Sequence, residues 1–233
     1  MKYLKFMMIS VLAAVAACGG SDATNAPRPV YESIPSPIPP SLVSEAYQAT
    51  ATSEFGDSIT LAGTARKAAS AKFVMVTWAT GAYTYPITPN LYRPGELVHP
   101  FATKTQQFGI PARPAADPSC SDGRWLASDG CHYGYAFPIT FDLTGVTLPD
   151  TFVYGIALNT QSYGAQPTAQ DGYYNSLNIG LVSMPPATGT RVAGTVHQSS
   201  SWSGAYQGTG TPGSFGPDTG WDMYAPAEFL AYE

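Results

Sequence analysis

The sequence predicts an all-β protein, a single antiparallel β-sandwich of the jelly-roll type with little helix. First, several runs alternate apolar and polar residues with the period of two that half-buried strands show, and the clearest run spans 133–143. Second, these runs are separated by turn residues, in a chain with 23 glycines and 21 prolines. Third, no stretch longer than about ten residues keeps a helical period of 3.6 with capping residues.

The first residues, 1–17, are predicted to be a signal peptide. Lys2 and Lys5 precede an apolar run that is too short to span a bilayer and that ends in small residues. The run closes on Val-Ala-Ala-Cys at 15–18, which resembles the lipobox of bacterial lipoproteins. This resemblance implies export, lipidation of Cys18 (palmitate or a similar acyl chain) and a membrane anchor at the outer membrane or cell surface. An ordinary signal peptide with an unmodified Cys18 is the alternative.

The mature chain is expected to start with a linker and to continue into one domain. Residues 18–45 are assigned to the lipidated cysteine and a proline-rich linker, and residues 46–233 to the β-sandwich. Prolines stand at positions 27, 29, 35, 37, 39 and 40. Such a chain favours an extended conformation over a packed element. The alternative, in which this arm packs along the domain, rests on Tyr31, Ile34 and Ile38.

Strand candidates follow one another through the predicted domain. Residues 73–78, Phe-Val-Met-Val-Thr-Trp, are apolar on both faces and predict a central strand. In 133–143 the odd positions are apolar, and Pro138 on the polar face predicts an edge or a bulge, because proline cannot donate a ladder hydrogen bond. Further alternating runs lie at 57–64, 151–159 and 177–181. The best short helix candidate is 41–47.

Cysteine usage predicts one disulfide. With Cys18 assigned to the lipid, Cys120 and Cys131 remain as a pair in an oxidising compartment. The alternative is a metal site formed by these two cysteines and His132, although no Cys-x-x-Cys spacing is present. No metal is therefore expected at this loop.

Charge and acidic residues limit the choice of partners. Removal of the signal peptide lowers lysine plus arginine from 11 to 9 against 16 acidic residues, so the formal charge moves from -5 to -7. An acidic chain without a basic stripe is not expected to bind nucleic acid. No cofactor is predicted. Asp117, Asp122 and Asp129 could supply oxygen ligands to calcium, but turn formation is the favoured role of these residues.

Aromatic residues give the best candidates for ligand binding. Several of them stand among Ser, Gly and Thr in the stretch 194–226, and another lies inside the predicted disulfide loop. Exposed rings with nearby hydroxyl and amide groups can hold a sugar, whose C–H face stacks on the ring. The candidates are Trp125, Trp202, Tyr206, Trp221 and Tyr224. The alternative is that these rings pack beneath a long loop.

Motifs for catalysis are missing from the sequence. No phosphate-binding loop, zinc-hydrolase signature or common serine-nucleophile motif is present, so no catalytic residue is assigned and an enzyme is the less favoured class. A jelly-roll polysaccharide hydrolase or lyase would need titratable side chains to converge in one cleft. The candidates for that convergence are His132, Asp142, His197, Asp218 and Asp222.

Two resemblances bear on the domain. The segment SEFGDSITLAGTAR at 53–66, the loop WLASDGC at 125–131 and the strand after it resemble a family of exported bacterial β-sandwich domains of unassigned function. The strand count and the loop aromatics resemble jelly-roll carbohydrate-binding modules in architecture, which transfers no functional residue. The expected function is an envelope lipoprotein with a glycan-binding sandwich. The alternatives are a structural or adhesion protein that binds envelope proteins, and a jelly-roll hydrolase or lyase.

Overall fold

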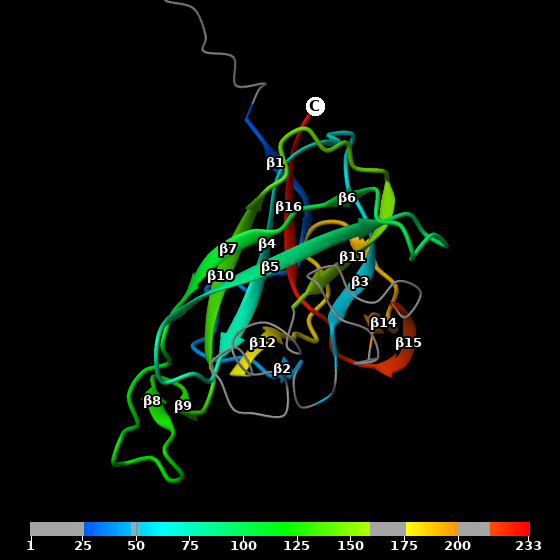
Figure 1. Cartoon of the computed structure of the whole chain (residues 1–233). Helices are drawn as coiled ribbons and strands as arrows, with labels where there is room; N and C mark the ends of the chain where they lie inside the picture. The colour runs from blue at the N-terminus through cyan, green and yellow to red at the C-terminus, as the bar shows by residue number, and fades with distance from the viewer. Residues whose placement is uncertain (1–25, 48–49, 51, 159–175, 200–214) are drawn as a thin grey trace, which may run out of the picture.

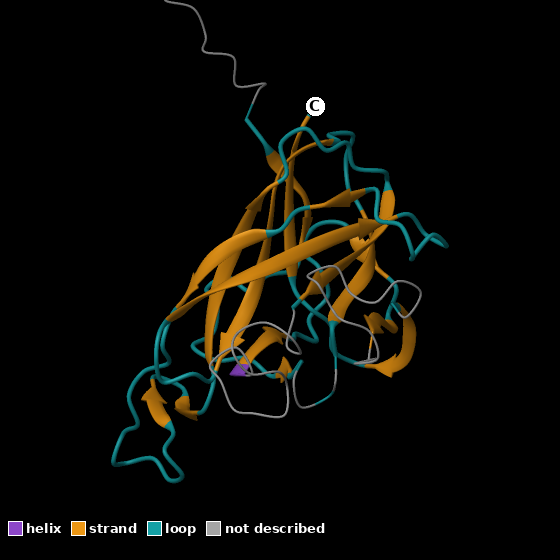
Figure 2. Cartoon of the chain, viewed as in Figure 1, coloured by secondary structure: helices purple, strands orange, loops and turns teal. Residues whose placement is uncertain are grey.

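The computed structural model describes residues 26–47, 50, 52–158, 176–199 and 215–233 (Figure 1). This part of the chain consists almost entirely of strands and loops and contains no α-helix; the short purple segment in Figure 2 is a 3₁₀ position at Ser176, just before Leu177. It therefore holds no helix long and apolar enough to cross a membrane. Every strand pairing is antiparallel, which confirms the predicted all-β class and the antiparallel sheets.

One sheet is organised around the longest strand, β4. Its strands are β1 (Arg28–Glu32), β2 (Ser44–Glu45), β4 (Lys67–Thr77), β10 (Tyr135–Asp142), β12 (Leu177–Gly180) and β16 (Ala227–Tyr232). Along one edge β4 pairs with β10, and along the other it pairs first with β16 and then with β12. β16 continues to β1 and β12 continues to β2. β4 is thus central, as its two apolar faces predict.

The second sheet has β3 and β11 at its centre. Its strands are β3 (Glu54–Thr60), β5 (Tyr83–Tyr92), β6 (Ala102–Thr103), β7 (Gln106–Ile110), β11 (Thr151–Ala157), β13 (Thr190–Arg191), β14 (Gly194–Ser199) and β15 (Gly216–Trp221). The main path runs β15-β14-β3-β11-β5-β6, with β13 added to β3 and β7 added to β5. β13 and β14 therefore follow one another along the same edge of β3.

Aromatic rings from both sheets meet in the core. Phe73 of β4 lies 5.9 Å from Phe229 of β16 and 5.5 Å from Tyr154 of β11, measured between ring centroids. Phe152 of β11 lies 5.1 Å from Phe229. All four side chains are fully buried, and each contributes about 1.5–3 kcal/mol of hydrophobic stabilisation relative to an exposed ring. This cluster joins the two sheets into a sandwich.

The proline-rich stretch belongs to the sandwich from Arg28 onward, which corrects the predicted linker at 18–45. β1 pairs with β16, and Tyr31 is fully buried. Further along, a second small cluster covers the outward face of β4 and β10. It consists of Val74, Val76 and Ala136 beneath Ile34, Ile38 and Leu42. Prolines restrict backbone hydrogen bonding but do not prevent the apolar residues between them from packing.

The helix candidate at 41–47 is wrong, because β2 lies there instead. Glu45 pairs with Ile179 of β12, and the Leu181 amide donates to the Val43 carbonyl at 2.7 Å. Sheet pairing therefore outweighs the local helical preference. The prediction for Pro138 holds: this residue is exposed on β10, which in the described part of the chain pairs with β4 alone.

The predicted disulfide is present and closes a small hairpin. Cys120 and Cys131 are bonded, with 5.8 Å between their Cα atoms, so the metal site proposed for these cysteines is excluded. The hairpin consists of β8 (Trp125–Ala127) and β9 (Gly130–His132). It projects from the body of the sandwich at the lower left of Figure 1, just before β10.

Candidate functional site

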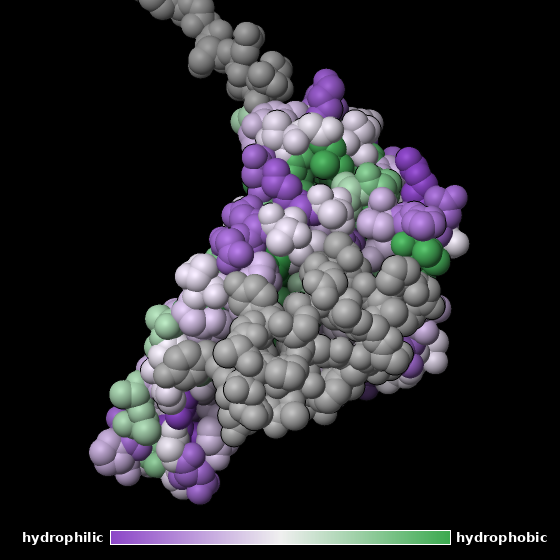
Figure 3. Space-filling view, viewed as in Figure 1, coloured by the Kyte–Doolittle hydropathy of each residue, from purple (hydrophilic) through white to green (hydrophobic). Residues whose placement is uncertain are grey.

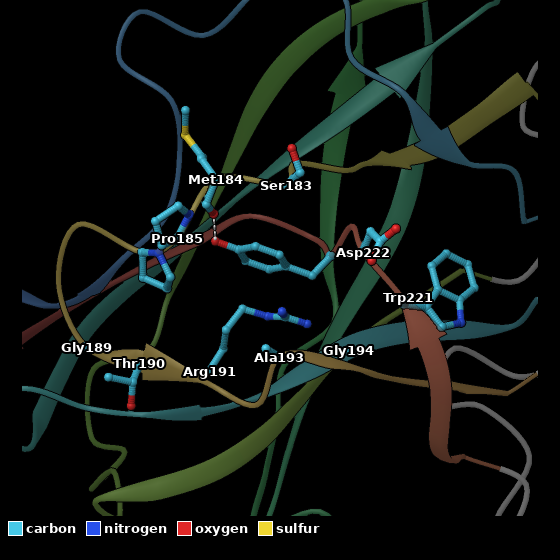
Figure 4. A pocket seen from close by; sticks show the side chains of 12 residues that line it. Ser183, Met184, Pro185, Gly189, Thr190, Arg191, Ala193, Gly194, Trp221 and Asp222 are labelled. Carbon is cyan, nitrogen blue, oxygen red and sulfur yellow. Dashed lines mark hydrogen bonds between the residues drawn. The ribbon is translucent and has the colours of Figure 1, made fainter.

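A cavity of about 450 Å³ lies where the loop after β12 meets the end of β15. This volume falls within the range of small-molecule sites, about 300–1,000 Å³. Figure 4 shows Met184 and Pro185 on one side, Trp221 and Asp222 on the other, and Arg191 between them. The buried ring of Tyr224 completes the lining.

Arg191 of β13 forms the charged floor of this pocket. Its Nε donates to Asp57 Oδ2 at 2.5 Å, and its Nη2 donates to the Thr195 carbonyl at 2.8 Å. The guanidinium carbon lies 4.1 Å from the ring centroid of Tyr224, a cation–π contact. Arg191 is thus held on three sides by fixed partners and is pre-organised without a ligand.

Asp57 is the buried counter-charge beneath that floor. It lies on β3 and shares the inward face with Phe55 and Ile59. Burial raises the pKa of its carboxyl to about 6, while Arg191 and the Ser58 amide act in the opposite direction. At neutral pH the pair is ionised on both sides and cancels in charge. The pocket therefore takes its net charge from Asp222, which is exposed at its rim.

The aromatic wall of the pocket is also fixed in place. Trp221 Nε1 donates to Asp218 Oδ2 at 2.8 Å, and Gln198 donates to the same oxygen at 2.5 Å. The indole meets Phe55 edge to face, with 5.3 Å between ring centroids. Trp221 remains half-buried and is one of the residues that line the cavity.

The opposite wall, formed by Met184 and Pro185, is apolar, and one hydrogen bond joins it to Tyr224. Tyr224 donates its hydroxyl to the Met184 carbonyl at 2.8 Å, the bond drawn in Figure 4. The side chain of Met184 is about half exposed. Ser183 and Thr190 add hydroxyl groups at the rim. The site thus combines a ring, an apolar wall and several hydrogen-bonding groups.

The five aromatic candidates have different positions. Trp221 and Tyr224 are brought together at the pocket. Trp125 is buried in the hairpin, where its Nε1 donates to the Gly134 carbonyl at 2.9 Å, so its ring serves the packing of this loop. Trp202 and Tyr206, like Cys18, lie outside the described residues.

The titratable residues considered for catalysis do not form one cleft in the described residues. Asp142 is exposed on β10, and His132 bonds to Asp129 at 2.8 Å in the hairpin. His197 is buried on β14 against Phe215. Of the other two, Asp222 lines the pocket, whereas Asp218 is not part of the lining and accepts the hydrogen bond of the Trp221 indole. This arrangement gives no support to a hydrolase or lyase site.

The acids considered for calcium have local roles. Asp117 accepts from the Ser119 amide and hydroxyl, and Asp129 accepts from His132. Asp122 adopts a left-handed backbone conformation, φ 61°, which is typical of a turn. Within the described ranges no three His, Cys, Asp or Glu side chains gather as a metal site.

Sequence reasoning missed a second buried carboxyl, Glu54, on the outward face of β3. It accepts hydrogen bonds from Asn90 Nδ2 at 2.9 Å and from the Tyr92 hydroxyl at 3.0 Å. Burial raises its pKa to about 8, so it is largely protonated at neutral pH. Gly155 leaves room for this side chain, since a Cβ there would lie 2.2 Å from Glu54 Oε1. In the sequence, the only indication of this contact is one polar residue within each of two strands, Glu54 in β3 and Asn90 in β5.

Arg191 was also missed, because its partner Asp57 is 134 residues away in the sequence. Searches against family models, curated proteins and solved structures found no match to this chain. The geometry of the pocket therefore carries the functional argument.

Proposed function

We propose that this protein is an exported envelope lipoprotein whose β-sandwich binds a neutral saccharide in the Arg191–Trp221 pocket. The observation that supports this most is that Trp221, Tyr224 and Arg191 line one cavity, formed where the segments 183–194 and 221–224 meet. Aromatic side chains combined with a few fixed polar groups are typical of pockets that bind small ligands.

The chemistry of the lining fits one sugar unit. The accessible part of the Trp221 ring offers a face for the C–H groups of a pyranose, and the Met184 side chain offers apolar contact across the cavity. Hydroxyl and carboxylate groups of Thr190 and Asp222 can accept hydrogen bonds from sugar hydroxyls. Because Trp221 and Arg191 are already held by Asp218 and Asp57, binding orders few side chains.

The charge of the site favours an uncharged sugar. Asp57 neutralises Arg191, whereas Asp222 at the rim and Asp218 behind the indole have no cation among their described contacts. An acidic sugar would meet a negative local potential, and the whole chain is acidic as well. A neutral saccharide avoids both penalties.

The binding test is calorimetric titration with soluble neutral oligosaccharides of glucose and N-acetylglucosamine. Trp221→Ala should weaken binding at least tenfold, and Asp222→Asn should weaken it less. Asp142→Asn, an exposed acid on β10 outside the pocket, is the matched control and should bind as the wild type does. No binding by the wild type, or unchanged binding by Trp221→Ala, would refute the pocket.

The anchor has a separate test. Cys18→Ser should abolish metabolic labelling with a palmitate analogue and release the protein from membranes; a variant that stays membrane-bound contradicts lipidation. Because packing of the domain starts at Arg28, the ten residues from Cys18 to Arg28 limit the distance between anchor and sandwich to about 35 Å. The domain would thus stay close to the membrane surface.

A further inference from the structure

Two large aromatic side chains are exposed together at the hairpin end of the sandwich. Trp78 follows the end of β4 and is 48% exposed, and Tyr133 follows β9 and is 39% exposed. Their rings stack with 5.5 Å between centroids and 20° between planes. Alternation predicted an inward Tyr133, but the ring instead lies on Trp78. This pair, which we call the Trp78–Tyr133 platform, shares no residue with the pocket.

Gly134 is the residue that makes this stacking geometry fit. A Cβ at this position would lie 2.8 Å from Trp78 Nε1 and 2.5 Å from Val76 Cγ1, so a side chain would force the indole to move. The carbonyl of the same residue accepts the hydrogen bond from Trp125 that ties the hairpin to the sandwich. One glycine thus positions the indole of the platform and anchors the loop that supplies its second ring.

The second ring is held from the hairpin side. Arg124 places its guanidinium carbon 5.7 Å from the Tyr133 ring centroid, and its own Nη2 and Nε donate to the Ser121 hydroxyl and carbonyl at 2.6 and 3.2 Å. The disulfide between Cys120 and Cys131 closes the loop that carries Arg124. The platform is therefore a supported and rigid surface.

Stacking covers one face of each ring, and Arg124 lies over the ring of Tyr133, so the face that remains for a ligand is that of Trp78. We propose that the Trp78–Tyr133 platform is a second saccharide-binding surface, in which the indole of Trp78, backed by Tyr133, takes the flat C–H face of a pyranose ring of an uncharged polysaccharide. An aromatic side chain has a surface of about 150–250 Å², so the exposed fractions of the two residues correspond to at most about 130–220 Å² of ring surface. A stable protein partner needs about 800 Å² on each side. The ring surface is far below that area and close to the face of one or two sugar units.

The surroundings of the platform suit a polar ligand. Hydrophobic and hydrophilic residues alternate over the projecting end of the molecule instead of forming one apolar patch (Figure 3). In the hairpin, His132 and Asp129 pair with each other, and Arg113 donates to the Gly123 carbonyl at 2.9 Å. The hairpin is thus rich in polar groups, and one of them, the guanidinium of Arg124, lies over the Tyr133 ring itself.

The experiment is a depletion isotherm of the mature protein on microcrystalline cellulose and on chitin. Trp78→Ala should weaken retention on at least one of them about tenfold, and Trp78→Phe should keep most of it, because a ring face remains. Leu126→Ala is the matched control: this hairpin residue is 51% exposed and apolar, yet not part of the stack, so its loss should change nothing.

Several results would overturn the platform. These are no retention of the wild type on either polysaccharide, equal retention of Trp78→Ala, and an equal loss for Leu126→Ala, which would indicate general hydrophobic adhesion. A dimer in sedimentation that Trp78→Ala abolishes would instead make the surface a contact between two copies. The pocket and the platform can be refuted separately. Trp221→Ala, and not Trp78→Ala, should weaken binding in the titration with short soluble oligosaccharides.

Discussion

β3 carries two buried carboxyl groups three residues apart, one on each face, and the two differ in their ionisation at neutral pH. Asp57 points into the core and pairs with Arg191, so it is ionised at neutral pH although burial raises its pKa to about 6. Glu54 points outward, accepts hydrogen bonds from Asn90 and Tyr92, and has its pKa raised to about 8. Asp57 therefore acts as a charge, and Glu54 largely as a neutral hydrogen-bonding group.

The difference shows which of the two acids serves the pocket. Paired charges at Asp57 and Arg191 hold the guanidinium against Tyr224 while adding no net charge to the cavity. Glu54 instead links β3 to Tyr92 and Asn90 across β11, and so joins three strands of the second sheet. The following changes are intended to separate these two roles.

The largest expected effect comes from breaking the ionic pair. Arg191→Met leaves Asp57 buried without its cation and should lower the free energy of unfolding by about 3–5 kcal/mol, measured by urea denaturation. The double variant Asp57→Asn with Arg191→Met should recover most of that loss, because no unpaired charge remains. A loss below about 1 kcal/mol for Arg191→Met would contradict the importance of the pair.

The next effect is the pH dependence due to Glu54. Its folded pKa of about 8 lies above the ordinary value of 4.5, so the folded chain retains a proton that the unfolded chain releases. Stability should therefore fall as pH rises from about 4.5 to about 8, by on the order of 4–5 kcal/mol. Glu54→Gln, which resembles the protonated acid, should remove most of this decline in thermal unfolding at pH 5 to 9, and the part that remains below about pH 6 comes from Asp57, whose pKa is also raised. Glu96→Gln, on an exposed turn, should leave the decline unchanged.

A substitution on the neighbouring strand β11 tests the position of the Glu54 carboxyl. Gly155→Ala places a methyl group 2.2 Å from Glu54 Oε1 and 2.7 Å from its Cδ, so the carboxyl must leave its hydrogen-bonding position. The expected cost is about 1–3 kcal/mol in denaturation midpoint experiments. Gly109→Ala on β7, where a methyl group meets nothing within 4 Å, is the control. Equal stability of both variants would contradict the packing of Glu54 over Gly155.

The smallest expected effect is the loss of one hydrogen bond. Tyr92→Phe should destabilise the protein by about 1 kcal/mol. It should also raise the pKa of Glu54 further, because the Tyr92 hydroxyl stabilises the carboxylate. The upper end of the pH window in which stability declines should then move upward, while its lower end stays at the unfolded value of about 4.5, as thermal unfolding over pH can show. A downward movement would mean that Tyr92 favours the protonated acid instead.

The strands could be predicted from sequence where the signal is local. The period of two at 133–143 and the apolar run at 73–78 depend on neighbouring residues only, and both mark real strands, β10 and β4. The packing of the proline-rich stretch could not be predicted in this way. It depends on apolar residues of β4 and β10 that lie far along the chain.

The candidate site was predictable only in part, for the same physical reason. Trp221 and Tyr224 were found because aromatic residues in a polar stretch are unusual in composition. Arg191 and Glu54 gain their roles from partners on other strands, at separations of 134 residues to Asp57 and 36 residues to Asn90. A single charged residue in a sequence gives no indication of such a partner.

The pairing of β1 with β16 has a consequence for how fast the protein folds. Arg28 and Glu233 near the ends of these strands are bonded across 205 residues, and Thr190 of β13 pairs with Thr60 of β3, 130 residues earlier in the chain. Each such contact must close a long loop before burial compensates the lost chain entropy, so folding on the time scale of milliseconds to seconds is expected. A newly made chain would expose its apolar strands throughout that interval, and exposed, unpaired strands favour aggregation.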